Sequence, residues 1–176
     1  GVEPRPFRLF LEPISGNVLP SPMRIALYQP DIPQNAGTLI RLSACLGFVL
    51  HVIRPAGFTL TDKNLRRASL DYGPAASITD HASFEQFDLW RRQHGRRLVL
   101  MTTKATTSGY RFAFGPGDIL MVGRETSGVP PEVAAGVDAR IRLPMRAEAR
   151  SINVALAAAM MVGEAYRQTD AFEELA

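Results

Sequence analysis

The sequence predicts an α/β fold in which a mostly parallel sheet is flanked by helices. Short apolar runs alternate along the chain with segments of helical periodicity, a pattern typical of parallel strands joined by helical crossovers. Two of the runs, LVLM at 98–101 and ILMV at 119–122, are apolar at every position, as expected of strands that are covered on both faces. At 176 residues the chain is long enough for one domain with its own hydrophobic core.

The predicted strands are short apolar runs bounded by turn residues. The first, at 24–28, is closed by Gln29 and Pro30. A second run follows at 48–53, and a weaker one at 76–78. After the two wholly apolar runs, the last strand is expected at 139–143. The sequence therefore predicts six strands separated by helical segments.

The predicted helices combine apolar periodicity with start and stop signals. Leucines at helical spacing indicate a helix over 35–46, which Gly47 ends as a C-terminal cap. Thr61 and Asp62 offer an N-cap for a short basic helix through residue 70, and a capping box from Ser83 to Gln86 opens a helix through residue 94. Pro131 can begin another helix, and Ser151 is expected to cap a long one over 151–167.

The last helix is apolar nearly all the way round, which a surface helix is not. Two interpretations are open, a helix buried within one domain and a helix covered by a second subunit. We favour the second, a homodimer, because a small domain seldom engulfs such a helix.

Composition predicts the state of the N-terminal residues, the absence of a membrane-spanning segment and the redox environment. Residues 1–22 contain five prolines and no periodicity, so we expect a disordered N-terminal extension or a cloning remnant, with a single domain over 23–176. No apolar run approaches the roughly 20 residues that span a bilayer. The single cysteine, Cys45, excludes an internal disulfide and fits a reducing cytoplasm, and its place in a helix predicts a buried side chain.

Arginine dominates the basic residues, with 18 Arg against 2 Lys at a net charge of +3. Guanidinium groups bind phosphates through paired hydrogen bonds, so a nucleic-acid partner is one interpretation. The other is a GC-rich genome that encodes Arg where others encode Lys. Charge alone does not decide between them.

Several functional classes are excluded by missing motifs. The chain has no Walker A loop, no G-x-G-x-x-G after a strand and no Ser/His/Asp pattern around a nucleophile elbow. His51, His81 and His94 fall in different elements without metal-ligand spacing, so no metal site is expected.

Three segments join a probable strand to a probable helix, where open α/β sheets build ligand sites. They are NAGTLIR at 35–41, GRETSGVP at 123–130, and LPM at 143–145 followed by SIN at 151–153. Each offers backbone amides, small residues and one or two polar side chains. Singly they are ordinary loops, but their order along the chain is specific.

These segments resemble the three motifs of the SpoU branch of the SPOUT RNA methyltransferases. Residues 23–168 as a whole resemble the minimal members of that branch, which methylate the ribose 2′-hydroxyl of the tRNA wobble nucleotide, a cytidine or uridine; YQPDIP at 28–33 and TTK at 102–104 add to the likeness. The resemblance implies a C-terminal deep trefoil knot, S-adenosyl-L-methionine as methyl donor, tRNA as substrate and an obligate homodimer. It also implies these cofactor-binding residues: Met101, Thr102, Gly123, Glu125, Leu143, Met145, Ser151 and Asn153.

The same resemblance gives Arg41 and Asn35 catalytic roles. Arg41 would activate the attacking hydroxyl, either as a base or as a charge that orients the ribose-phosphate; we expect the second, because arginine stays protonated near neutral pH. Asn35 would hold its loop and touch the substrate. The expected RNA contacts are Arg66, Arg67, Arg146 and Arg150. Two alternatives stay open: methylation of another RNA, and a non-catalytic RNA-binding protein of the same fold.

Overall fold

The computed structural model describes residues 23–59, 61–69 and 76–175, and a six-stranded sheet organises them. The strands lie in the order β3-β2-β1-β5-β4-β6, and every neighbouring pair is parallel. Their bounds are β1 Arg24–Tyr28, β2 Val49–Ile53, β3 Ser77–His81, β4 Leu98–Met101, β5 Ile119–Val122 and β6 Ala139–Ile141. The predicted α/β class with a parallel sheet is confirmed.

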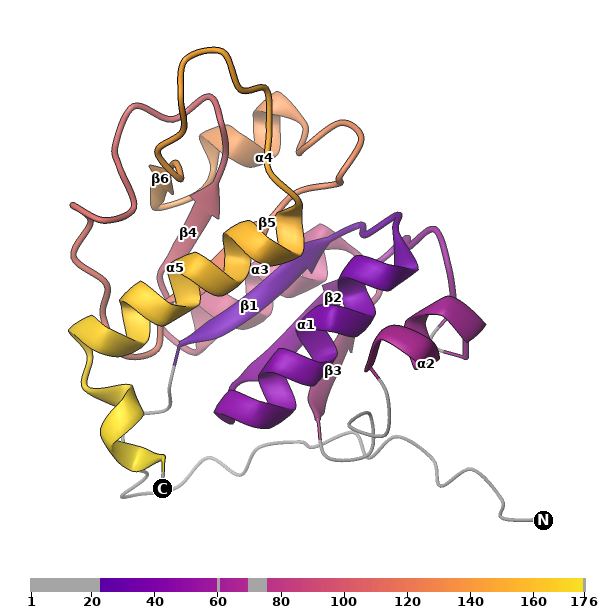
Figure 1. Cartoon of the computed structure of the whole chain (residues 1–176). Coiled ribbons are helices and arrows are strands. Elements are labelled where there is room, and N and C mark those ends of the chain that lie inside the picture. The colour runs from indigo at the N-terminus through magenta and orange to yellow at the C-terminus, as the bar shows by residue number, and fades with distance from the viewer. Residues whose placement is uncertain (1–22, 60, 70–75, 176) are drawn as a thin grey trace.

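Helices cover both faces of the sheet (Figure 1). They are α1 Pro33–Leu46, α2 Lys63–Ser69, α3 Phe84–Gln93, α4 Pro131–Ala135 and α5 Val154–Gln168, followed by the 3-10 helix η2 Ala171–Glu174. Alternation along β1 divides the core: Ile25 and Leu27 pack with α1 and α5, whereas Ala26 and Tyr28 pack with α3 and α4. The α1 and α5 helices therefore share one face of the sheet.

Several element ends differ from the sequence-based expectation; besides the start of α5, three of them differ by two residues or more. Helix α1 begins at Pro33 rather than at residue 35, because proline fits the first helical turn. Strand β6 ends at Ile141, since Arg142 leaves the ladder and donates its N–H to Thr107 O (2.9 Å). Strand β3 runs on to His81 through polar residues that an apolar pattern does not include.

Two further expectations are wrong. Asn153, not Ser151, caps α5: its Oδ1 accepts the N–H groups of Ala155 (2.9 Å) and Leu156 (3.2 Å). Cys45 is exposed rather than buried, because its position in α1 falls on the solvent-facing side with Arg41. The η2 turn was not predicted.

Gly37 lets α1 and α2 pack closely. A Cβ atom at this position would lie 2.5 Å from Leu65 O and 2.7 Å from Ala68 Cβ, so only glycine fits. This contact fixes α2, with Arg66 and Arg67 exposed on it, beside the helix that carries Arg41.

Some sequence-based expectations concern features that the structure leaves untested. Residues 1–22, expected to be an extension, lie outside the described residues, as does residue 70, the expected end of α2. Strand order and pairing do not test the trefoil knot, which stays a prediction. Among the described residues, no helix has the length and apolar character that crossing a membrane requires.

Candidate active site

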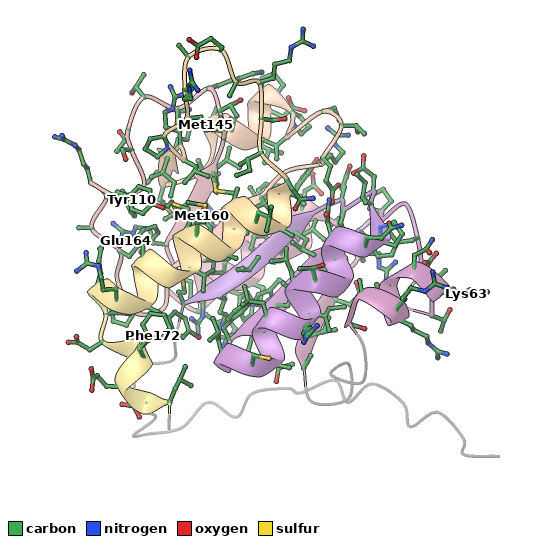
Figure 2. All side chains as sticks on the ribbon, viewed as in Figure 1. Lys63, Tyr110, Met145, Met160, Glu164 and Phe172 are labelled. Carbon is green, nitrogen blue, oxygen red and sulfur yellow. The ribbon has the colours of Figure 1, made fainter. Side chains whose placement is uncertain are left out.

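A pocket of about 220 Å³ opens at the carboxyl ends of β4, β5 and β6. Parallel α/β sheets bind ligands at this edge, because loops from neighbouring strands converge there. The lining residues come from the ends of these strands, the loops that follow them and α5: Leu100, Met101, Thr102, Thr103, Gly123, Arg124, Glu125, Gly128, Val129, Leu143, Met145, Ser151, Ile152, Val154 and Ala157. Figure 2 shows Met145 in the loop between β6 and α5.

Seven of the eight residues expected to hold the cofactor line this pocket. The eighth, Asn153, does not; it caps α5 and contacts Asn35. Segments that are 50 residues apart along the chain, from Met101 to Ser151, thus meet in one cavity. Two of the three predicted segments, 123–130 and 143–153, therefore meet here, whereas no residue of the first, 35–41, lines the pocket.

The turn from Gly123 to Val129 forms one wall of the pocket and folds back on itself. Arg124 and Gly128 exchange backbone hydrogen bonds, with N···O distances of 3.1 and 2.8 Å. Gly128 has a φ of +65°, and a Cβ at Gly123 would lie 2.8 Å from Gly128 Cα. Glycine is required at both positions, at one for conformation and at the other for space.

A directed chain of amide groups links the starts of α5 and α1 to this turn. The Asn153 side chain donates from Nδ2 to Asn35 Oδ1 (2.9 Å), because its own oxygen already accepts the capping bonds. Asn35 Nδ2 then faces Glu125 Oε1 at 3.5 Å. Asn35 is buried and does not line the pocket, so it acts on the pocket through Glu125.

Glu125 pairs with Asp31, which lies in the loop that follows β1. Asp31 donates its backbone N–H to Glu125 Oε2 (3.1 Å), and Glu125 donates its own N–H to Asp31 Oδ1 (3.2 Å). Burial raises the pKa of Glu125, and the Asp31 side chain raises it further. The pKa of Asp31 is lowered, first by the Glu125 side chain and then by a hydrogen bond from Thr126. As pH falls, Glu125 therefore takes up a proton before Asp31 does.

Arg41 lies away from the pocket of its own chain. It is six residues beyond Asn35 in α1, about 9 Å along the helix axis. Its side chain is on the exposed side of α1 and is not among the lining residues. The structure of one chain therefore does not bring Arg41 to the pocket.

The residues expected to contact RNA are exposed in two places. Arg66 and Arg67 lie on α2, whereas Arg146 and Arg150 lie in the loop between β6 and α5 that also supplies Met145 and Ser151 to the pocket. Arg146 is 3.7 Å from Glu148, an ion pair too exposed to hold it firmly.

Eight lining residues were not predicted, nor was Asp31. Thr103, Arg124 and Gly128 lie inside segments already recognised. Their position beside predicted cofactor-binding residues could have identified them. Val154 and Ala157 were not predicted because they are apolar residues of α5 whose sequence pattern indicates only helix packing. Asp31 lies in the recognised segment YQPDIP at 28–33, but only its hydrogen bonds with Glu125 reveal its role.

The lining suits S-adenosyl-L-methionine. Leu100, Leu143 and Met145 provide apolar surface for a purine, while Thr102 and Ser151 provide hydroxyls. The Glu125 carboxylate is an anionic group for a cationic ligand. No group of three or more potential metal ligands occurs among the described residues.

A parallel sheet with a pocket of this composition at its carboxyl edge defines an α/β enzyme that takes a nucleoside cofactor. The model of the SpoU rRNA Methylase family matches residues 22–163, and the chain belongs to this family. A protein of Ancylobacter novellus named tRNA (cytidine(34)-2′-O)-methyltransferase is 53% identical over 150 residues, which is 85% of this chain and 95% of that protein. A protein of the same name from Escherichia coli K12 is 41% identical, over 83% of this chain and 93% of that one.

Solved structures agree with this assignment. One described as structural insights into the 2-OH methylation of C/U34 on tRNA matches with a TM-score of 0.79 and 42% identity, over 85% of this chain and 97% of that chain. The SpoU methyltransferase AviRb from Streptomyces viridochromogenes, solved with AdoMet, matches with a TM-score of 0.78 and 27% identity, over 86% of this chain and 62% of that chain. The resemblance drawn from the sequence is confirmed.

Proposed function

We propose that the chain is an S-adenosyl-L-methionine-dependent tRNA methyltransferase that modifies the ribose 2′-hydroxyl of cytidine or uridine at position 34. The observation that carries this proposal is the likeness to relatives of that name over nearly their whole length. The pocket agrees with it, because seven residues assigned to the cofactor from the sequence line one cavity.

The cofactor, when bound, supplies a methyl group on a positively charged sulfur. Met101, Leu143 and Met145 would cover its apolar parts, and the Gly123–Val129 turn would close over it. Ser151, just before α5, would hold its polar end. By fixing the donor, these residues leave the attacking hydroxyl a defined line of approach, which is worth much of the acceleration of an in-line displacement.

Arg41 would act on the substrate from a second chain, in a homodimer. The outer side of α5 presents Leu156 and Met160, which are 57 and 45% exposed. Ile152 (40%) lies in the loop just before the helix, and Tyr110 (44%) lies in a loop beside it (Figure 2). That loop packs on α5, since a side chain at Gly109 would overlap Met161. Large apolar side chains exposed together in this way are typical of a subunit interface.

Within this dimer, Arg41 on the exposed side of α1 would reach the pocket of the partner subunit. Its guanidinium would orient the ribose-phosphate and stabilise the oxygen that loses its proton. Arg66, Arg67, Arg146 and Arg150 would contact backbone phosphates on either side of the pocket. We further propose that the enzyme works in the cytoplasm, where its tRNA substrate is found.

Incubation with labelled S-adenosyl-L-methionine and total tRNA, followed by nucleoside mapping, tests the proposal. A 2′-O-methylated nucleotide at position 34 is the expected product. Methyl label at another position of tRNA would contradict the proposed nucleotide and leave the enzyme class in place. Absence of cofactor binding would indicate a non-catalytic RNA-binding protein.

A further inference from the structure

Asp31 lies where the connectivity of the sheet reverses. From β1 the chain proceeds to β2 and β3 on one side, and it returns through β4 and β5 on the other. The loops that leave β1 and β5 therefore part from each other, and Asp31 and Glu125 face each other between them. Such switch points are where open α/β sheets hold their ligands.

Three hydrogen bonds join Asp31 to the turn that follows β5. Two are the reciprocal bonds with Glu125, and the third is donated by Thr126 Oγ1 to Asp31 Oδ2 (2.6 Å). Thr126 is exposed. The two backbone hydrogen bonds between Arg124 and Gly128 lie within the turn itself and do not connect it to the sheet. Asp31 thus fixes the position of this turn relative to the sheet.

Asp31 is itself held on its other side. Gly57 donates its N–H to Pro30 O (2.9 Å), and a Cβ at Gly57 would lie 3.1 Å from Asp31 Cα. Gln29 has a φ of +43°, a left-handed conformation that non-glycine residues seldom adopt unless their surroundings impose it. The backbone around Asp31 is therefore held in place, and this fixes the position of the Asp31 carboxylate.

We propose that Asp31 is a positioning residue that holds the Gly123–Val129 turn in the form that binds the cofactor. This inference rests on the proposed function, since it concerns the same pocket. Asp31 is not among the residues lining the pocket, so it acts through Glu125 and Thr126.

The test measures the Kd of S-adenosyl-L-methionine by calorimetry for wild type and for four variants. Asp31→Ala removes both acceptor oxygens, and Thr126→Val removes one bond. We expect Kd to rise about tenfold for Asp31→Ala and about threefold for Thr126→Val, the scale of one or two lost hydrogen bonds. Asp80→Ala is the matched control, because it removes a carboxylate that pairs with Arg54 on the sheet edge at 2.9 Å. Its Kd should not change.

Asp31→Asn supplies a readout that a general loss of stability would not give. The amide still accepts one hydrogen bond but carries no charge, and the Asp31 side chain adds to burial in raising the pKa of Glu125. The acid limb of cofactor binding should therefore move to lower pH in Asp31→Asn, while Thr126→Val leaves it in place. If Asp31→Ala does not fold, the shift of the acid limb in Asp31→Asn tests the proposed role of Asp31 by itself.

An unchanged Kd in Asp31→Ala, or an unmoved acid limb in Asp31→Asn, overturns the inference. A wild-type chain that binds the cofactor but leaves nucleotide 34 unmethylated overturns the proposed substrate alone. A wild-type chain that does not bind the cofactor overturns both.

Discussion

Asn153 at the start of α5 donates a hydrogen bond to Asn35 near the start of α1, with an Nδ2···Oδ1 distance of 2.9 Å. The far ends of the same two helices are joined as well, since Tyr166 Oη donates to Leu46 O (2.8 Å). Helices α1 and α5 are therefore parallel neighbours, tied at both ends. The starts of both helices meet beside Glu125, at the rim of the pocket.

Asn153 combines a structural and an orienting role that substitution can separate. In Asn153→Asp, the new carboxylate still caps α5 but no longer donates to Asn35, whose amide must turn away from Glu125. We expect a free energy of unfolding within about 0.5 kcal/mol of wild type, whereas Asn153→Ala should lose about 1 kcal/mol with the cap. Turnover should fall about tenfold in both variants. Urea denaturation and steady-state kinetics would check this, and wild-type turnover in Asn153→Asp would refute the orienting role.

Arg41 is predicted to act in trans. Arg41→Ala should lose methyl transfer while cofactor binding is kept, because Arg41 does not line the pocket of its own chain. Gly123→Val should lose cofactor binding, because a side chain there would overlap Gly128. When equal amounts of the two inactive variants are mixed, half of the dimers combine one intact pocket with one intact Arg41, and activity should return to about a quarter of wild type.

The mixing experiment has its own control. Each variant exchanged with itself should stay inactive, and light scattering should show dimers throughout. If the mixture is inactive although subunits exchange, Arg41 acts within its own chain or has no role in transfer.

The sequence was sufficient to place most strands because each has its own apolar signal, whereas β3, which is largely polar, was predicted only in part. The two strands that are apolar at every position, β4 and β5, were placed at their observed bounds, since burial on both faces leaves no other composition. Helix starts were predicted less well. Ser151 and Asn153 are both good N-cap residues, and only the tertiary contact with Asn35 favours Asn153.

The pocket was predictable to the extent that its residues belong to recognisable segments. Gly123 and Glu125 fall within one such segment. Asp31 was missed because its partner is 94 residues away along the chain and no local pattern connects them. Cys45 was wrongly predicted to be buried for a related reason. It lies in an apolar stretch, but whether its face of α1 is buried depends on which elements cover the helix.

The arginines on α2 are predicted to bind tRNA without affecting the cofactor. Replacing Arg66 and Arg67 with alanine should raise the KM for tRNA and leave the Kd of S-adenosyl-L-methionine unchanged, because both side chains are exposed and outside the pocket. The dependence of tRNA affinity on salt should also become shallower, by about 0.7 to 0.9 in the logarithmic slope for each phosphate that the variant leaves unneutralised. Filter binding over a range of salt concentrations measures both effects. An unchanged slope would place the RNA elsewhere.

Gly37 is predicted to set the position of α2. Gly37→Ala would place a Cβ 2.5 Å from Leu65 O, so α2 must move away, at a cost of about 1–3 kcal/mol in the free energy of unfolding. Because Arg66 and Arg67 move with α2, the KM for tRNA should rise. Gly136→Ala at the end of α4 is the matched control, since a Cβ there would lie 3.6 Å from its nearest neighbour, an ordinary contact. Thermal denaturation should show no loss in the control; equal losses in both would mean that the α1–α2 contact is not tight.

Two buried histidines predict that stability falls in mild acid. Arg24 Nη1 donates to His51 Nε2 (3.3 Å), so the proton of His51 is on Nδ1 and is donated to His81 Nε2 (2.8 Å). Both rings are therefore neutral in this arrangement. Burial lowers the pKa of His51 well below its usual value, with the charge of Arg24 adding to the effect, and burial also lowers the pKa of His81.

The sign of the effect follows from these lowered pKa values. Below about pH 6.5 the unfolded chain binds protons that the folded chain does not, so the free energy of unfolding decreases as pH falls, by up to about 1.4 kcal/mol per pH unit for each histidine. Above that pH the contribution is fully present. Urea denaturation at a series of pH values should show this slope in wild type and, little changed, in His94→Gln, because His94 is exposed and is the smallest contributor to the lowered pKa of His51. The slope should shrink in His51→Gln and His81→Gln; a wild-type slope retained in both would assign the acid sensitivity to other groups.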